Sequence, residues 1–97
     1  MIKIIGKRCT GKTTKLIGLT IANNAILIVP SEITKRTIIN TCSLLKNKVY
    51  TYNDIRSGRH FGTIYSGMFI DELDSCLNFI RFLDDTDTIL GYSISTD

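Results

Sequence analysis

GKRCTGKT, residues 6–13, is the stretch from which the fold of this chain can be predicted. It follows an apolar segment, Ile2–Ile5, and precedes a segment compatible with a helix, Thr14–Ala22. Its spacing, G-x-x-x-x-G-K-[ST], is that of a loop that holds phosphate groups between a strand and a helix. Gly6 and Gly11 permit backbone conformations that a Cβ atom would obstruct, so the loop amides can point toward an anion at the positive end of the helix.

The side chains of this loop are the candidate ligands of a nucleotide. We expect Lys12 to reach the β- and γ-phosphates and the hydroxyl of Thr13 to hold Mg²⁺. Arg8 is interpreted either as a γ-phosphate ligand or as a solvated charge, and Cys9 as a spacer. The residues predicted to bind the nucleotide are Gly6, Lys7, Arg8, Cys9, Thr10, Gly11, Lys12, Thr13 and Thr14.

The composition predicts one globular domain over residues 1–97, with 43% hydrophobic and 22% charged residues. The net charge of +3 permits a nucleic-acid partner, although much of the basic excess lies in the phosphate loop. Cys9, Cys42 and Cys76 form no C-x-x-C pair, so reduced thiols are expected rather than a zinc site or disulfides. The absence of a signal peptide and of a ~20-residue apolar run predicts a cytoplasmic protein without a membrane span.

Patterns typical of strands alternate with patterns typical of helices along the chain. Strands are predicted at 2–5, 25–29, 48–52, 66–71 and 88–94, and helices at 14–22, 32–45 and 73–83, with a capped turn at 53–58. Such alternation favours right-handed βαβ crossovers and a parallel sheet. We therefore predict an α/β fold, a three-layer sandwich with a mostly parallel sheet of four to five strands.

The apolar residues of these segments predict the core. We expect the segments 2–5 and 25–29 to be buried on both faces, as parallel strands usually are. The first helix is expected to bury a band made of Leu16, Ile17, Leu19, Thr20 and Ile21, and the second a face made of Ile33, Ile38, Ile39, Cys42 and Leu45. Ser31 is the predicted N-cap of the second helix.

A second motif ends the fourth predicted strand, where Asp71 and Glu72 follow the apolar Met68–Ile70. Asp71 is a candidate ligand of the Mg²⁺ bound by Thr13, and Glu72 a candidate to polarise a water or to take a proton from a hydroxyl acceptor. The alternative is that both acids only begin a helix, where negative charge is favourable. Parallel sheets bind ligands at the carboxyl ends of their strands, where the loop, the acids and the polar residues 93–96 converge.

Together the motifs resemble those of P-loop NTPases that have a catalytic glutamate, a group that includes helicases, AAA-type ATPases and viral packaging motors. Ile26–Ser31 resembles the second strand of helicase and terminase cores, which ends in a Pro-Ser/Thr step. Ile89–Thr96 resembles their strand with a polar tip that senses the γ-phosphate. Tyr52–Arg59 suits phage-type members.

The resemblance implies a minimal P-loop NTPase fold that binds and hydrolyses ATP or another nucleoside triphosphate with Mg²⁺, in helicase- or terminase-like nucleic-acid metabolism. It implies that Glu72 and Lys12 are catalytic and that Thr13 and Asp71 bind the metal. Ser95 or Thr96 would sense the γ-phosphate. The candidate partners are the nucleotide and DNA or RNA.

The chain departs from this family in one respect, because the family continues beyond the sensor strand whereas this sequence ends at Asp97. In the family's strand order, such a truncated core leaves the strand at 2–5 on an edge. An exposed apolar edge is a liability. We therefore expect a homo-oligomer, a partner subunit or another covering of that edge.

Two other functions stay open. A nucleoside kinase of the thymidine-kinase type shares a similar loop and acidic strand end, although Asp74–Cys76 does not match its continuation. A non-hydrolysing accessory subunit is the other alternative. The basic residues Arg56, Arg59 and His60 are interpreted as an arginine finger or a nucleic-acid contact, or else as a solvated loop. Base stacking or packing is expected of the aromatic residues Tyr50, Tyr52, Phe61 and Tyr65.

Overall fold

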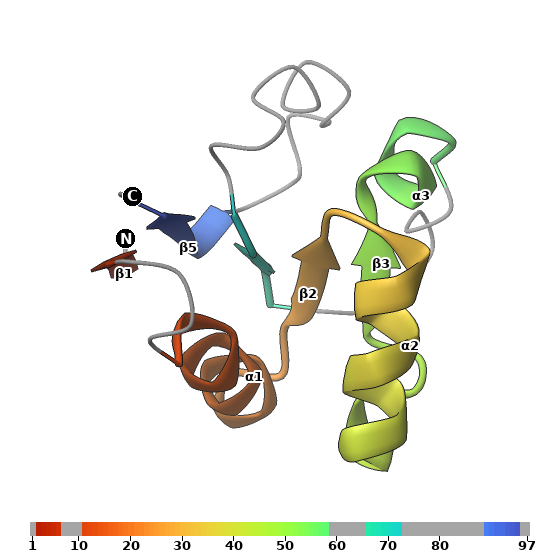
Figure 1. Cartoon of the computed structure of the whole chain (residues 1–97), viewed down its shortest axis with the longest axis horizontal. Coiled ribbons are helices and arrows are strands. Elements are labelled where there is room, and N and C mark those ends of the chain that lie inside the picture. The colour runs from red at the N-terminus through yellow and green to blue at the C-terminus, as the bar shows by residue number, and fades with distance from the viewer. Residues whose placement is uncertain (1, 7–10, 59–65, 73–88, 96–97) are drawn as a thin grey trace.

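The computed structural model is an α/β sandwich whose five-stranded sheet is parallel throughout (Figure 1). The structure describes residues 2–6, 11–58, 66–72 and 89–95. The strands are β1 (Ile2–Gly6), β2 (Ile26–Val29), β3 (Val49–Thr51), β4 (Met68–Ile70) and β5 (Ile89–Ser95). The helices are α1 (Lys12–Ala22), α2 (Glu32–Thr41), the 3₁₀ turn η1 (Ser43–Leu45) and α3 (Tyr52–Arg56). The order across the sheet is β1-β5-β4-β2-β3, and the predicted fold class is confirmed.

Helices lie against both faces of this sheet (Figure 1). One face packs with α1 and α2 into a cluster of Leu16, Ala25, Leu27, Val29, Ile38, Leu45, Val49 and Phe69. The opposite face packs with α3 into a cluster of Ile26, Ile28, Tyr52, Ile55, Met68 and Ile70. The side chains from Ala25 to Val29 alternate between the two clusters and are all fully buried, which confirms the prediction for this strand. The helix predicted at 73–83 lies outside the described residues.

The prediction that the first strand is buried on both faces is wrong. β1 lies at the edge of the sheet and pairs with β5, so one side of its backbone has no neighbouring strand among the described residues. Ile5 is 61% exposed, and Ile2 is exposed as well. The expectation that this strand lies on an edge of the sheet is confirmed for the described residues.

Two isoleucines assigned to the helical core are also exposed. Ile21 of α1 and Ile33 of α2 each lie five positions from a buried residue of the same helix, Leu16 and Ile38 respectively. Five residues correspond to a rotation of about 140° around a helix of 3.6 residues per turn. A helix lying on a sheet buries a narrower stripe than this, so both side chains face away from the sheet.

The second helix is shorter than predicted, because α2 ends at Thr41 and Cys42 is extended before η1. Thr41, Cys42 and Ser43 are weak helix formers, which accounts for the break. The start of α2 agrees with the prediction, since the Ser31 hydroxyl accepts a hydrogen bond from the amide of Thr34 at 3.3 Å.

The turn predicted at 53–58 is the helix α3, and it begins one residue earlier. Its N-cap is Thr51, whose hydroxyl accepts from the amide of Asp54, while the Asp54 carboxylate accepts from the Thr51 amide at 3.0 Å. Lys35 of α2 donates to the same carboxylate at 3.1 Å. Burial alone would raise the pKa of Asp54, but the Thr51 amide and Lys35 bring that pKa below its ordinary value. The contacts of Asp54 therefore join α3 to the end of β3 and to α2.

The packing of β5 between its neighbours predicts a large effect at Gly91. A Cβ atom there would lie 2.6 Å from the carbonyl oxygen of Ile2 and 3.0 Å from ring atoms of Phe69. We expect Gly91→Ala to lower the free energy of unfolding by about 1–3 kcal/mol, because the added atom overpacks the sheet. Gly18→Ala is the matched control: its Cβ meets nothing within 4 Å, and alanine should stabilise α1 by about 0.8–1 kcal/mol. Urea denaturation measures both, and equal effects would contradict this packing.

Within the described residues, no helix has the length and apolar character needed to cross a membrane.

Candidate functional site

The carboxyl ends of β1, β4 and β5 lie at one end of the sheet and carry the candidate site. The segment predicted to bind phosphate follows β1, which ends at Gly6, and leads into α1, which begins at Lys12. Gly11 immediately precedes α1 with φ of 79°, a left-handed conformation that glycine adopts without strain. Four predicted phosphate ligands, Lys7, Arg8, Cys9 and Thr10, lie outside the described residues.

Lys12 is the first residue of α1 and is only 7% exposed. Its ammonium group donates a hydrogen bond to the carbonyl oxygen of Gly6 at 3.1 Å. This contact joins the two ends of the loop, because Gly6 is the last residue of β1. The Lys12 ammonium group, which is predicted to bind phosphate, therefore lies directly beside the start of the loop.

Thr13 and Asp71 are 58 residues apart in the sequence, and the fold brings their side chains together. The Thr13 hydroxyl lies 3.3 Å and 3.2 Å from the two carboxylate oxygens of Asp71. Asp71 is placed by its backbone, since its amide donates to the carbonyl oxygen of Ile28 and continues the pairing of β4 with β2. The expectation that the loop threonine and the strand-end acid would be neighbours is confirmed.

Ser93 of β5 is a third member of this cluster, and its individual role was not predicted. Its hydroxyl donates to Asp71 at 3.0 Å and accepts from the amide of Glu72 at 2.8 Å. The residues predicted to sense the γ-phosphate are Ser95 or Thr96 instead; the Ser95 side chain and all of Thr96 lie outside the described residues. A signal was available, because a serine within an apolar strand beside the acidic strand is fully buried only when it has polar partners.

The environment of Asp71 disfavours an unpaired negative charge. The residue is 3% exposed, and burial raises its pKa above the ordinary value. The negative charge of Glu72 acts in the same direction, whereas hydrogen bonds from Ser93 and Thr13 and the charge of Lys12 oppose it. A cation bound at this carboxylate would compensate for the lost hydration.

Glu72 follows Asp71 in a left-handed conformation, with φ of 52°. This region is uncommon for a residue with a side chain, and it occurs most often at sites where the surrounding structure maintains it. The hydroxyl of Tyr52 lies within hydrogen-bond distance of the carbonyl oxygens of Asp71 and Glu72. The sequence alone indicates only stacking or packing for the side chain of Tyr52, because its contact with the acidic turn depends on the tertiary fold.

The donor set of the site suits magnesium. Hydroxyl and carboxylate oxygens are the ligands that Mg²⁺ prefers, and its sites commonly combine one or two protein groups with phosphate and water oxygens. Thr13 and Asp71 provide such a pair. Among the described residues there is no group of three or more His, Cys, Asp and Glu side chains that could bind a metal without other ligands.

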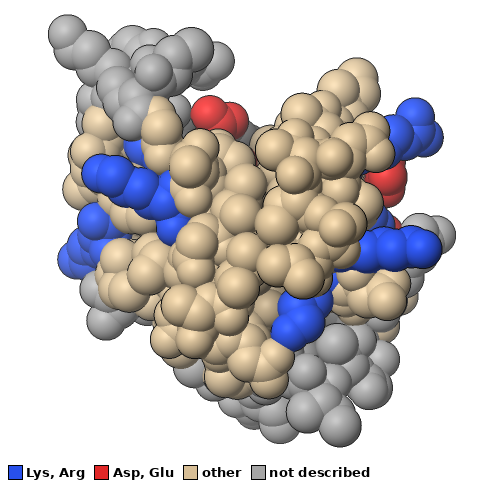
Figure 2. Space-filling view, turned by 90° about the horizontal axis from the view of Figure 1, so that it is seen from below, with Lys and Arg blue, Asp and Glu red and all other residues tan. Residues whose placement is uncertain are grey.

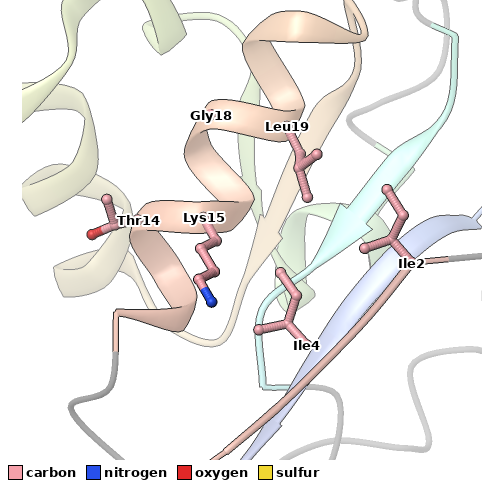
Figure 3. Close-up of a pocket in the computed structure, with 6 residues that line it drawn as sticks. All are labelled: Ile2, Ile4, Thr14, Lys15, Gly18 and Leu19. Carbon is pink, nitrogen blue, oxygen red and sulfur yellow. The ribbon is translucent and has the colours of Figure 1, made fainter.

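An apolar groove of about 440 Å³ lies beside the site, between the exposed edge strand and α1 (Figure 3). Ile2 and Ile4 of β1 point toward Leu19 of α1 across it, and Lys15 lies at its end nearer the phosphate loop. Its apolar walls offer little to a triphosphate. They suit apolar side chains instead.

The charges of the described residues show no single basic stripe on the face seen in Figure 2. Lysine and arginine side chains lie there in separate groups, mostly toward the rim, with uncharged surface between them. Dispersed charge of this kind does not identify a nucleic-acid interface on that face.

Comparisons with protein-family models, with curated proteins and with solved structures found no match to this chain. The loop motif and the geometry of the cluster around Asp71 are therefore the features that indicate a function for this chain.

Proposed function

We propose that this protein is a Mg²⁺-dependent P-loop nucleoside triphosphatase that binds and hydrolyses ATP or another nucleoside triphosphate. The observation that carries the proposal is the contact between Thr13 and Asp71, at 3.2 Å for the shorter pair of oxygens. The motif alone predicts a phosphate loop, but it does not require an acid from a distant strand to lie beside its threonine. This pair supports a metal-assisted reaction at the amino end of α1.

Each residue then has a role that its position supports. The amides at the start of α1 and the ammonium group of Lys12 would bind the phosphate oxygens. Thr13 and Asp71 would hold Mg²⁺, which when bound would neutralise part of the charge of the phosphates. Glu72, adjacent to the metal ligand, would orient the water that attacks the γ-phosphate.

The Thr13 hydroxyl provides a sharp test of this proposal. We expect Thr13→Ala to reduce Mg²⁺-dependent phosphate release by about 10²-fold or more, because an oxygen ligand of the metal is lost. Thr13→Ser keeps the hydroxyl and should retain most of the activity. The measurement is phosphate release from ATP with Mg²⁺ and with EDTA, at several nucleotide concentrations.

Other outcomes of this assay decide between the alternatives. Wild-type activity that is unchanged by EDTA, or equal activity of the alanine and serine variants, would contradict the metal role of Thr13. Transfer of the γ-phosphate to an added nucleoside, seen by thin-layer chromatography, would indicate a kinase. Nucleotide binding without phosphate release would indicate the accessory subunit.

We extend the proposal to the partners. The apolar groove and the edge of β1, which has no second neighbouring strand among the described residues and where Ile5 is exposed, support a covering of this edge by a second copy or by a partner subunit. A nucleic-acid partner and a cytoplasmic location remain predictions from the motif resemblance and the sequence composition.

A further inference from the structure

The acidic turn at the end of β4 is held by a residue from the far edge of the sheet. Tyr52, the first residue of α3, is 8% exposed. Its hydroxyl oxygen lies 2.5 Å from the carbonyl oxygen of Asp71 and 2.8 Å from that of Glu72. Since β2 separates β3 from β4 in the sheet, the Tyr52 side chain spans the end of β2 to make these contacts.

The peptide unit between Asp71 and Glu72 is held on both of its polar sides. Its carbonyl oxygen accepts from Tyr52, and its N–H group donates to the hydroxyl of Ser93 at 2.8 Å. Glu72 has φ of 52°, a conformation that costs a residue with a side chain roughly 1–2 kcal/mol. The two hydroxyls offset this cost by hydrogen bonding to both polar groups of the peptide unit.

Tyr52 is itself rigidly placed. It follows the cap residue Thr51 directly, and the reciprocal hydrogen bonds between Thr51 and Asp54 fix the first turn of α3. Lys35 of α2 pairs with Asp54 at 3.1 Å. Ile55 is almost fully buried in the same core cluster as Tyr52. The contacts that position the Tyr52 hydroxyl are therefore made by α3 and its neighbours, and they do not involve the phosphate loop.

We propose that Tyr52 is a positioning residue that fixes the backbone of Glu72 and so directs its carboxylate toward the reacting water. This inference rests on the proposed hydrolytic role of Glu72. It adds that catalysis depends on a hydroxyl that does not itself touch the nucleotide. Tyr52 makes no bond in the reaction, and its contribution passes through the direction of one side chain.

Tyr52→Phe keeps the buried ring and removes the hydroxyl, whose one proton is shared between the carbonyl oxygens of Asp71 and Glu72. We expect kcat for phosphate release to fall about tenfold, with the Kd for the Mg²⁺–nucleotide complex unchanged within about twofold, because the phosphate ligands are not disturbed. Tyr50→Phe, which removes a tyrosine hydroxyl two residues earlier on β3, is the matched control and should keep its kcat. In a Glu72→Gln background, Tyr52→Phe should lower kcat no further, because both changes act through one group.

A second readout is independent of hydrolysis. We expect the Glu72 amide to exchange its hydrogen about tenfold faster in Tyr52→Phe than in the wild type, since the turn opens more readily. The core amide of Leu27, which donates to the carbonyl oxygen of Lys48 at 2.8 Å, should keep its wild-type exchange rate.

The two readouts separate the possible failures. A wild-type protein that releases no phosphate refutes the hydrolytic function and with it the catalytic part of this inference, whereas hydrogen exchange still judges whether Tyr52 holds the turn. Unchanged kcat and unchanged exchange at Glu72 in Tyr52→Phe would overturn the inference. Faster exchange at Leu27 and Glu72 alike, with weaker nucleotide binding, would also overturn it, because the tyrosine would then serve stability alone.

Discussion

Replacement of Lys12 by alanine is expected to lower kcat/KM for nucleotide hydrolysis by about 10²–10³-fold, the range seen when one preorganised donor to a developing charge is removed. The Lys12 ammonium group lies at the junction of β1 and α1, 3.1 Å from the carbonyl oxygen of Gly6, and it is nearly buried. An ammonium group in this position can contact the β- and γ-phosphates throughout the reaction. Binding phosphate costs Lys12 little further hydration, because most of its hydration is already lost when the chain folds. Steady-state kinetics and calorimetric titration with nucleotide measure the effect.

Lys15→Ala is the matched control for this prediction. Lys15 belongs to the same helix, is exposed and lies at the end of the apolar groove. Its removal changes the net charge by the same amount, so a general electrostatic effect would appear in both variants. Equal losses in the two variants, or normal nucleotide binding and turnover by Lys12→Ala, would contradict the assigned role of Lys12.

Glu72→Gln is expected to separate binding from hydrolysis. The amide side chain has the shape of the carboxylate but cannot take a proton, so kcat should fall by about 10²–10⁴-fold, the usual contribution of a general base. The Kd for nucleotide should change little, because the residues proposed to bind phosphate lie in the segment 6–14 and do not include Glu72. Single-turnover phosphate release together with a binding titration tests both expectations.

Glu32→Gln serves as the control for this charge change. Glu32 is exposed in the first turn of α2 and lies outside the candidate site. Its substitution should leave kcat unchanged. Normal turnover by Glu72→Gln would remove Glu72 from its proposed role, and a parallel loss of nucleotide binding would show that the residue acts in binding instead.

The sequence was sufficient to predict the parts of the fold that depend on local patterns. The apolar run at 25–29 has no polar position, which is typical of a strand covered on both faces, and its side chains are fully buried. The left-handed residues Gly11 and Asn24 lie at the ends of α1, where glycine and asparagine are expected. The sequence also predicts that Thr13 and Asp71 lie close together, because the carboxyl ends of parallel strands lie at one edge of the sheet.

The remaining features depend on the tertiary arrangement. Ile5 belongs to an apolar segment of the kind that forms buried strands. It is nevertheless exposed, because β1 is an edge strand. Tyr52 begins α3 and Ser93 lies within β5, and both contact the turn that follows β4. No local pattern in the sequence indicates that these two hydroxyls hold the same peptide unit. Register and strand order decide such contacts, and neither is encoded within a short segment.

The position of the metal ion tests the central claim most directly. Crystals grown with Mn²⁺ and a non-hydrolysable ATP analogue would locate the ion by its anomalous signal. We predict a peak about 2.1 Å from the hydroxyl oxygen of Thr13, bridged to Asp71 directly or through water, with the triphosphate over the amino end of α1. A peak elsewhere, or a triphosphate bound away from the residues 6–13, would contradict the proposed function.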